Sequence, residues 1–198
     1  SPIGYFSGSN GTVRVDGATS TWTLTNSSLN VGEAGMGVLT ITNGAKVTDG
    51  NGSVIIGNAT GSNGSVFVED ANSTWTFTGN FEVGNASTGN LSISNGGNVT
   101  SGAADIGANT GATGNVTVTG ANSIWTVGGA LNVGKNDNGT LMITNGGKVV
   151  ANGTTYISYS TNGPGAVTVD GTNSTWDLGS SNLFVAGYGN GILTITNG

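Results

Sequence analysis

The chain contains no cysteine and no histidine, and only two of its 198 residues are proline. Without cysteine there is neither a disulfide staple nor a thiolate ligand, and without histidine there is no imidazole base. Cysteine nucleophiles, histidine-based triads and ordinary zinc sites are therefore excluded for this sequence. We expect no catalytic, cofactor-binding or metal-binding residues in it, and no cofactor.

Charge is also scarce. Lysine and arginine number 4 against 10 aspartates and glutamates, which gives a net charge of -6. No window gathers basic residues into a stripe that could neutralise phosphates, so nucleic acid is not an expected partner. No stretch reaches the roughly 18 apolar residues of a membrane-spanning helix, and residues 1–10 lack the basic-then-apolar order of a signal peptide. We expect no membrane span here and place any targeting segment outside this chain.

Glycine is abundant, with 38 residues, and the remaining apolar residues recur at regular places. The four tryptophans stand in the phrases GATSTWTLT, DANSTWTFT, GANSIWTVG and GTNSTWDLG. These phrases recur about every 51 residues, which indicates one unit copied four times. The copies start near residues 11, 64, 114 and 165.

A second phrase lies between the tryptophan phrases: VLTITNGAKV, NLSISNGGNV, TLMITNGGKV and ILTITNG. Aligning the two phrases gives a half-repeat of about 25 residues with three short segments of period-2 apolar alternation, separated by Gly- and Asn-rich turns. No apolar set recurs at helical spacing. The sequence therefore predicts an all-β, right-handed parallel β-helix (a β-solenoid), with three short strands per coil, two coils per repeat of about 51 residues, and coils about 4.8 Å apart.

The alternation predicts which side chains face the interior. The longest predicted ladder runs through Val13, Val15, Leu39, Ile41, Val66, Val68, Leu91, Ile93, Val116, Val118, Leu141, Ile143, Val167, Val169, Leu193 and Ile195. The third strand is written LNVG, VIIG, FEVG, ADIG, LNVG, YISY and LFVA, an alignment that places Tyr156 at the core position of Leu29. The glycine that ends this strand is expected to have a positive φ, with Ser158 or Tyr159 departing from the rule and Ala186 shifting it.

Two interpretations of the tryptophans are open. In one, Trp22, Trp75, Trp125 and Trp176 are buried and alternate with Val47, Val99 and Val149, so that each large layer is followed by a small one. In the other, the four rings form an exposed sugar-binding platform. Apolar residues two places later, such as Leu24 and Phe77, favour burial.

Two further patterns concern polar residues. Asn43, Asn95, Asn145 and Asn197 each precede a glycine, where we expect a left-handed conformation and stacking of asparagines between coils. Asp16, Glu69 and Asp170 occupy equivalent outward positions two coils apart, about 10 Å, with Thr119 in the remaining copy. We interpret them as solvated surface. Asp49 in DGNG and Asp137 in KNDNG have too few acidic neighbours to indicate a calcium loop.

The pattern VxVxGAxSxWT followed by LxVGxxGxGxLTITNGGxV resembles the repeat of type V autotransporter passengers and PEP-CTERM-associated surface proteins of bacteria, over essentially the whole chain. The resemblance implies an extracellular β-helix at the bacterial cell surface, with adhesion or aggregation, and in some cases virulence, as its role. It carries no binding residues to transfer. The departure YISYSTNGPG, from Tyr156, is interpreted as local decoration.

Residues 1–198 are expected to form a single uncapped solenoid segment, cut from a longer array. The function expected is that of a non-enzymatic structural or adhesive segment of a secreted surface protein. Its partners would be other copies, side by side or end to end, or a host or neighbouring cell surface or its glycans. The alternative is a filament or matrix subunit assembled by end-to-end strand addition. A polysaccharide-active enzyme is the least favoured hypothesis, because the acidic residues look scattered.

Overall fold

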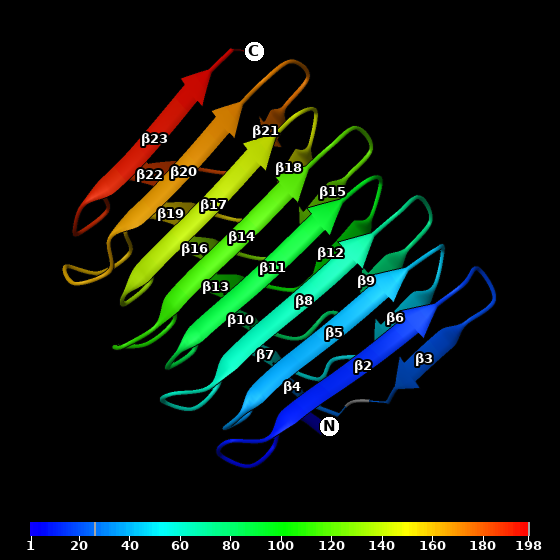
Figure 1. Ribbon diagram of the computed structural model, residues 1–198. Helices are drawn as coiled ribbons and strands as arrows, with labels where there is room; N and C mark the ends of the chain where they lie inside the picture. Colours follow the sequence, from blue (N-terminus) through cyan, green and yellow to red (C-terminus); the bar gives the residue numbers. More distant parts are fainter. Residues whose placement is uncertain (26, 198) are drawn as a thin grey trace.

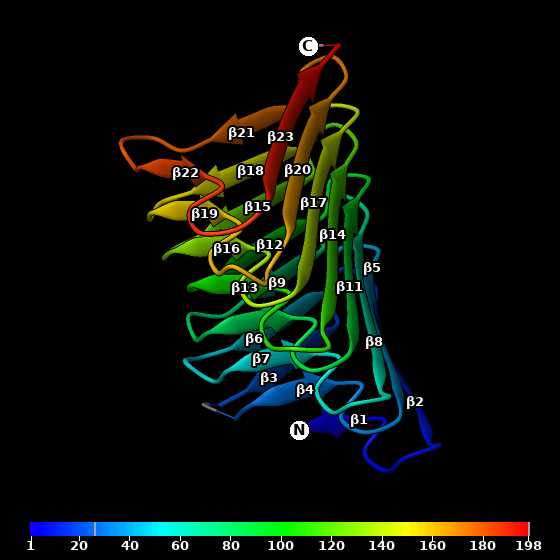
Figure 2. The ribbon, with the colours of Figure 1, turned by 90° about the vertical axis from the view of Figure 1, so that its left-hand side faces the viewer.

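A computed structural model describes residues 1–25 and 27–197 of this chain, which form 23 strands and no helix. No segment of that range is therefore a helix that could cross a membrane. The strands β2, β3 and β4 complete one coil, six similar coils follow, and β1 and β23 flank them (Figure 1). The expected right-handed parallel β-helix, with three strands per coil, is confirmed (Figure 2).

Corresponding strands of successive coils pair in parallel and in register, which produces three sheets named here by their first strand. The β1 sheet contains β1 (Pro2–Ile3), β4 (Leu29–Val31), β7 (Val54–Ile56), β10 (Phe81–Val83), β13 (Ala104–Ile106), β16 (Leu131–Val133), β19 (Thr155–Ile157) and β22 (Leu183–Val185). Its strands are the third segments of the coils predicted from the sequence.

The β2 sheet has the longest strands and corresponds to the first segment of each coil. It contains β2 (Asn10–Asp16), β5 (Met36–Thr42), β8 (Asn63–Glu69), β11 (Thr88–Ser94), β14 (Thr113–Thr119), β17 (Asn138–Thr144), β20 (Gly165–Asp170) and β23 (Gly191–Thr196). The β3 sheet, which carries the tryptophans, contains β3 (Thr21–Leu24), β6 (Lys46–Asp49), β9 (Thr74–Thr76), β12 (Asn98–Ser101), β15 (Ile124–Val127), β18 (Lys148–Ala151) and β21 (Thr175–Asp177).

The predicted interior ladder of the β2 sheet is confirmed along most of its length. From Val15 to Val169 its members are buried, and they pair in register, as Leu39 does with Val66. Val13 and Leu193 are partly buried, and Ile195 is 68 % exposed. These three side chains lie on β2 and β23, each of which has one neighbouring strand in the sheet instead of two.

The tryptophans face the interior. Trp75 and Trp125 are fully buried, and Trp22 and Trp176 are partly buried against the core. The favoured interpretation, that the tryptophans face the interior, is confirmed, and the alternative of an exposed row of four rings is wrong. The register pairs Val99 with Trp75 on one side and Trp125 on the other, so large and small layers alternate as predicted. This alternation explains why the sequence repeats every two coils and not every coil.

One position of the third strand was predicted wrongly. Thr155, not Tyr156, pairs with Leu131 and faces the core, while Tyr156 pairs with Asn132 on the outer face. The alignment had matched apolar character, whereas the turn fixes the register: Ser158 has a φ of 65° and takes the place of the usual glycine. Because the side-chain period of a strand is two residues, this slip of one residue reversed the predicted direction of Tyr156.

The left-handed turns are otherwise as expected. Gly57 has a φ of 73°, and a Cβ at this position would clash with the backbone of Thr88 in the next coil. Ala186 (φ 57°) adopts the same conformation in the last coil. Asparagines 43, 95, 145 and 197 also have positive φ, as predicted.

The expected stacking of asparagines occurs at a different turn. The asparagines that precede glycine recur only every two coils, so they are not neighbours in the stack. Asn43 and Asn145 donate instead to Asp16 (2.7 Å) and Thr119 (3.2 Å) of the neighbouring coil. A continuous amide ladder forms after the third strand, where Asn58 donates to Glu33 and accepts from Asn85 (both 2.9 Å), and Asn109 donates to Asn85. This ladder borders the outer face of the β1 sheet.

Candidate functional site

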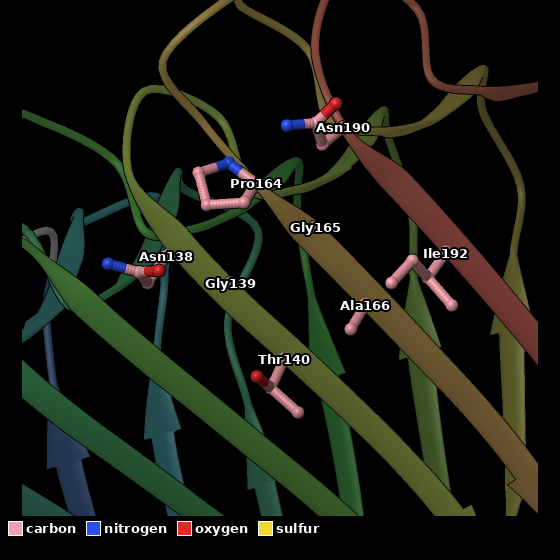
Figure 3. Close-up of a pocket in the computed structure, with 8 residues that line it drawn as sticks. All are labelled: Asn138, Gly139, Thr140, Pro164, Gly165, Ala166, Asn190 and Ile192. Carbon is pink, nitrogen blue, oxygen red and sulfur yellow. The ribbon is translucent and has the colours of Figure 1, made fainter.

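Described residues of the chain line two shallow hollows, and neither hollow assembles a reactive group. The first, of about 170 Å³, lies over the starts of β17, β20 and β23 (Figure 3). It exists because small Ala166 lies in register between Thr140 and Ile192. Its lining is Asn138, Gly139, Thr140, Pro164, Gly165, Ala166, Asn190 and Ile192. No titratable side chain lines it.

The second hollow, of about 390 Å³, lies at the turns that lead from the β3 sheet to the β1 sheet. Gly102, Ala103, Gly128 and Gly129 leave the space, and Phe77 closes its floor. Its polar groups are the hydroxyls of Thr78, Thr100 and Ser101 and the backbone. This set can donate and accept hydrogen bonds but holds no acid, base or charged group.

The acidic residues singled out in the sequence lie where they were predicted, on the outer face of the β2 sheet. Asp16 and Asp170 are separated from Glu69 by uncharged residues of the intervening strands. Asn43 and Arg14 donate to Asp16 and lower its pKa, and Thr196 and Asn197 do the same for Asp170. These carboxylates bind neighbouring coils together and do not converge.

The other acidic positions are also separate. Asp70 has a φ of 72°, so β8 ends before it, and its carboxylate accepts a hydrogen bond from Thr42 (2.6 Å). Asp137 accepts from the backbone of Gly111 (2.8 Å). Asp49 faces the interior and is 1 % exposed. Within residues 1–25 and 27–197, no three acidic residues lie close enough to hold a metal ion.

A carboxylate pair that the sequence reasoning missed lies on the outer face of the β1 sheet. Glu82 of β10 and Asp105 of β13 are direct partners in register, so their strands are adjacent. Asp105 accepts hydrogen bonds from Asn132 (2.7 Å) and from the ammonium of Lys135 (2.6 Å). The phrases FEVG and ADIG carry the signal: each has an acid at the second place of consecutive third strands.

The two carboxyl groups of this pair differ in their surroundings. Burial raises the pKa of Glu82, and the negative charge of Asp105 raises it further, whereas Lys135 acts in the opposite direction. Among the described residues the ion pairs are Arg14 with Asp16, Lys135 with Asp105, and Lys148 with Asp177. Glu82 is thus a half-buried acid without a cation of its own, and it would gain from a cationic neighbour.

Four aromatic side chains lie at the C-terminal end of the same face, and we call them the aromatic patch: Tyr156, Tyr159, Phe184 and Tyr188. Tyr156 and Phe184 stack with their ring centroids 4.8 Å apart and their planes at 12°. Tyr159 meets Tyr156 edge-on at 5.1 Å, and Tyr188 meets Tyr159 at 6.2 Å. Tyr159, Phe184 and Tyr188 are 40 %, 43 % and 69 % exposed. The patch is a cluster of large apolar surfaces on a face whose other outward strand positions are polar except for Ile55.

The sequence contains the signal for this patch in the phrases YISY, which the sequence analysis interprets as part of a local decoration, and LFVAGY, which it interprets only as a third strand and its turn. Gly187 helps to form the patch, because its lack of a side chain leaves room for the ring of Tyr156. A smaller exposed pair, Tyr5 and Phe6, follows β1 in the first turn of the same face.

Comparison of the chain with protein-family models, with curated proteins and with solved structures found no match.

Proposed function

We propose that this chain is a rigid, non-enzymatic structural and adhesive segment of a secreted bacterial surface protein of the autotransporter-passenger type. The observation that carries the proposal is the outer face of the β2 sheet, eight long strands in register. The resemblance of the repeat to surface-protein repeats supports it, and so does the stacking of coils into a rod, which suits a spacer that holds contacts away from the cell.

The outer face of the β2 sheet has the chemistry of a weak, repeated contact. Its central column reads Arg14, Thr40, Phe67, Ser92, Thr117, Met142, Thr168 and Thr194. Its charged side chains, Arg14, Asp16, Glu69 and Asp170, are few, and two of them form an ion pair (3.1 Å). When two copies of the chain lie side by side, these weakly charged faces repel each other little. Polar side chains of one face can then form hydrogen bonds with those of the other, directly or through water.

The test is clumping of cells or beads that display the chain. We expect sedimentation of the displaying cells, and loss of sedimentation when Thr40, Thr117 and Thr168 are all replaced by lysine, because like charges then face each other. The matched control places three lysines at Thr23, Thr48 and Thr76, on the outer face of the β3 sheet, and should still clump. Failure of the unmodified chain to clump would contradict the proposal.

A polysaccharide-degrading enzyme is the second candidate, and the Glu82–Asp105 pair is the observation that favours it. Adjacent strands lie about 4.8 Å apart, close to the roughly 5 to 5.5 Å between the carboxyls of retaining glycosidases. A Glu with a raised pKa beside an anchored carboxylate also suits an acid and a nucleophile. Against it, Lys135 and Asn132 both bind Asp105, which leaves that carboxylate a weak nucleophile. Release of reducing ends from neutral or amino-sugar polymers, abolished by Glu82→Gln, would establish this function in place of the first.

A further inference from the structure

We propose that the outer face of the β1 sheet, from the aromatic patch to Glu82, is a binding site for an extended polysaccharide that carries free amino groups. The inference goes beyond the proposed function, because binding of a glycan to the purified chain does not depend on clumping. It rests on the exposed rings, on the polar residues that continue their row, and on the charge of that row.

The rings of the aromatic patch are not needed to build the fold. In register with Tyr156, the preceding coil has Asn132 at the same outward position, and β4 has Asn30 there. Tyr159 likewise occupies the position, directly after the left-handed turn residue, that Asn58 and Asn85 occupy in other coils. At the outward position of Tyr156, the strands from β4 to β16 have polar residues except for Ile55 of β7, and none has an aromatic ring. The fold therefore does not require rings here, and rings that remain 40 % to 69 % exposed keep apolar surface in water. Such a cluster is typical of a contact surface.

The arrangement favours a sugar polymer over a flat apolar ligand. Neighbouring rings stand at 88° (Tyr156 and Tyr159) and 73° (Tyr159 and Tyr188), so the patch offers ring faces and edges in several directions. A pyranose has an apolar C–H face and a rim of hydroxyls, and it needs both aromatic surface and hydrogen-bonding groups. The tyrosine hydroxyls and the amide ladder of Asn58, Asn85 and Asn109 supply the second requirement.

The row is long enough for an oligosaccharide. Along the sheet, Phe184 is followed by Tyr156, Asn132, Asp105 and Glu82 at directly paired positions. Four strand spacings of about 4.8 Å give a track of about 19 Å. A chain lying on this track would contact the rings at one end and the carboxylate pair at the other.

The negative charge of this track favours sugars with amino groups over sugars with acidic groups. The track contains the carboxylates of Glu82 and Asp105, and its ammonium, Lys135, is already paired with Asp105. An amino group near Glu82 would supply the missing counter-charge, and ammonium groups also bind well over tyrosine faces. Uronic-acid or sulfated polymers would meet net negative charge instead. The whole chain, at -6, adds to this preference.

The experiment is calorimetric titration of the purified chain with a glucosamine hexamer, compared with an N-acetylglucosamine hexamer of equal length and a galacturonate hexamer. We expect the glucosamine hexamer to bind at least tenfold more tightly than the acetylated one, to weaken with added salt, and the galacturonate hexamer not to bind. Equal affinity for the acetylated hexamer, tighter binding of galacturonate, or oligolysine binding as tightly as glucosamine would overturn the proposal.

Variants locate the site. Tyr156→Asn with Tyr159→Asn introduces the residues found in equivalent positions, and should weaken binding at least tenfold while the unfolding midpoint stays near that of the parent. Phe184→Asn, a second variant of the patch, should act in the same direction.

Glu82→Gln should weaken binding of glucosamine and not of its acetylated form. Phe67→Thr removes an aromatic from the β2 sheet instead and should leave binding unchanged. Undiminished binding in both patch variants would contradict the assignment.

Discussion

At the scale of single residues, the tryptophans contribute most to the core. Trp75 is fully buried and packs against Phe77 and Phe81, with ring centroids 4.9 and 5.7 Å away. We expect Trp75→Ala to lower the free energy of unfolding by about 3 to 5 kcal/mol. Trp22→Ala should cost clearly less, because Trp22 is only partly buried. Chemical denaturation of the two variants checks this, and equal costs would contradict the difference in burial.

A second residue-scale effect concerns the indole N–H groups. Nε1 of Trp125 donates to Oγ of Ser101 (3.1 Å). Asp49 holds the equivalent place before Trp75, two residues after the valine in register with the tryptophan. There, among the described residues, the Trp75 N–H has no hydrogen-bond partner. The signal for the buried Ser101 was in the sequence, at the last place of VTS, but no single position shows that a tryptophan lies above it.

Asp49→Ser should therefore stabilise the chain. Burial raises the pKa of Asp49, so the folded state favours the protonated carboxyl, and this contribution is lost as pH rises through the raised pKa. The variant has no carboxyl to ionise, so it does not lose this stability as pH rises. Its serine hydroxyl can also accept a hydrogen bond from the Trp75 N–H, as Ser101 does from Trp125. We expect its midpoint to exceed the parent's by more at pH 7 than at pH 4, by an amount on the order of 1 kcal/mol for the hydrogen bond alone. Asp16→Asn, the control, should not stabilise, because Asp16 has a lowered pKa and is exposed. A gain in stability that is independent of pH would argue against this cause.

At the scale of elements, buried serines join turns of successive coils. The backbone N–H of Gly44 donates to Oγ of Ser73 (2.9 Å), and Gly96 donates to Ser123 in the same way (3.0 Å). This explains the serine in the tryptophan phrase, which the sequence alone did not. Ser73→Ala leaves the Gly44 N–H buried without an acceptor, and we expect a loss of about 1 to 3 kcal/mol, measured by denaturation. Ser92→Ala, on the outer face of β11, should change stability by less than a third of that.

The elements themselves were largely predictable from the sequence, because period-2 alternation and glycine turns recur in every coil. What failed was local register. Tyr156 looks apolar, and only the φ of Ser158 shows that the turn comes one residue earlier than the alignment of YISY with LNVG implies. The candidate site was harder to see, because Glu82 and Asp105 come together only once the register of two coils is known. Pairing across coils, not composition, creates that site.

At the scale of the whole molecule, tryptophan and valine layers alternate from coil to coil, so we expect that coils can be removed in pairs but not singly. Deleting residues 88–137 removes two coils and places Trp75 beside Val149, as in the parent order. Deleting residues 88–112 removes one coil and places Trp75 beside Trp125. We expect the first deletion to fold with a similar midpoint per coil and the second to be markedly less stable, because two large layers overfill the core. Circular dichroism with thermal melts checks both, and equal stability would contradict the layer argument.

The aromatic patch distinguishes one position along the axis of the solenoid from the others. Most of the surface is nearly unchanged by a shift of two coils, about 10 Å. A partner that reads only the threonine columns can therefore slip along the axis and bind in several offsets. The rings of Tyr156, Tyr159, Phe184 and Tyr188 break this translational symmetry. A ligand held there has a single place along the described coils, which turns a repetitive rod into one with a marked position.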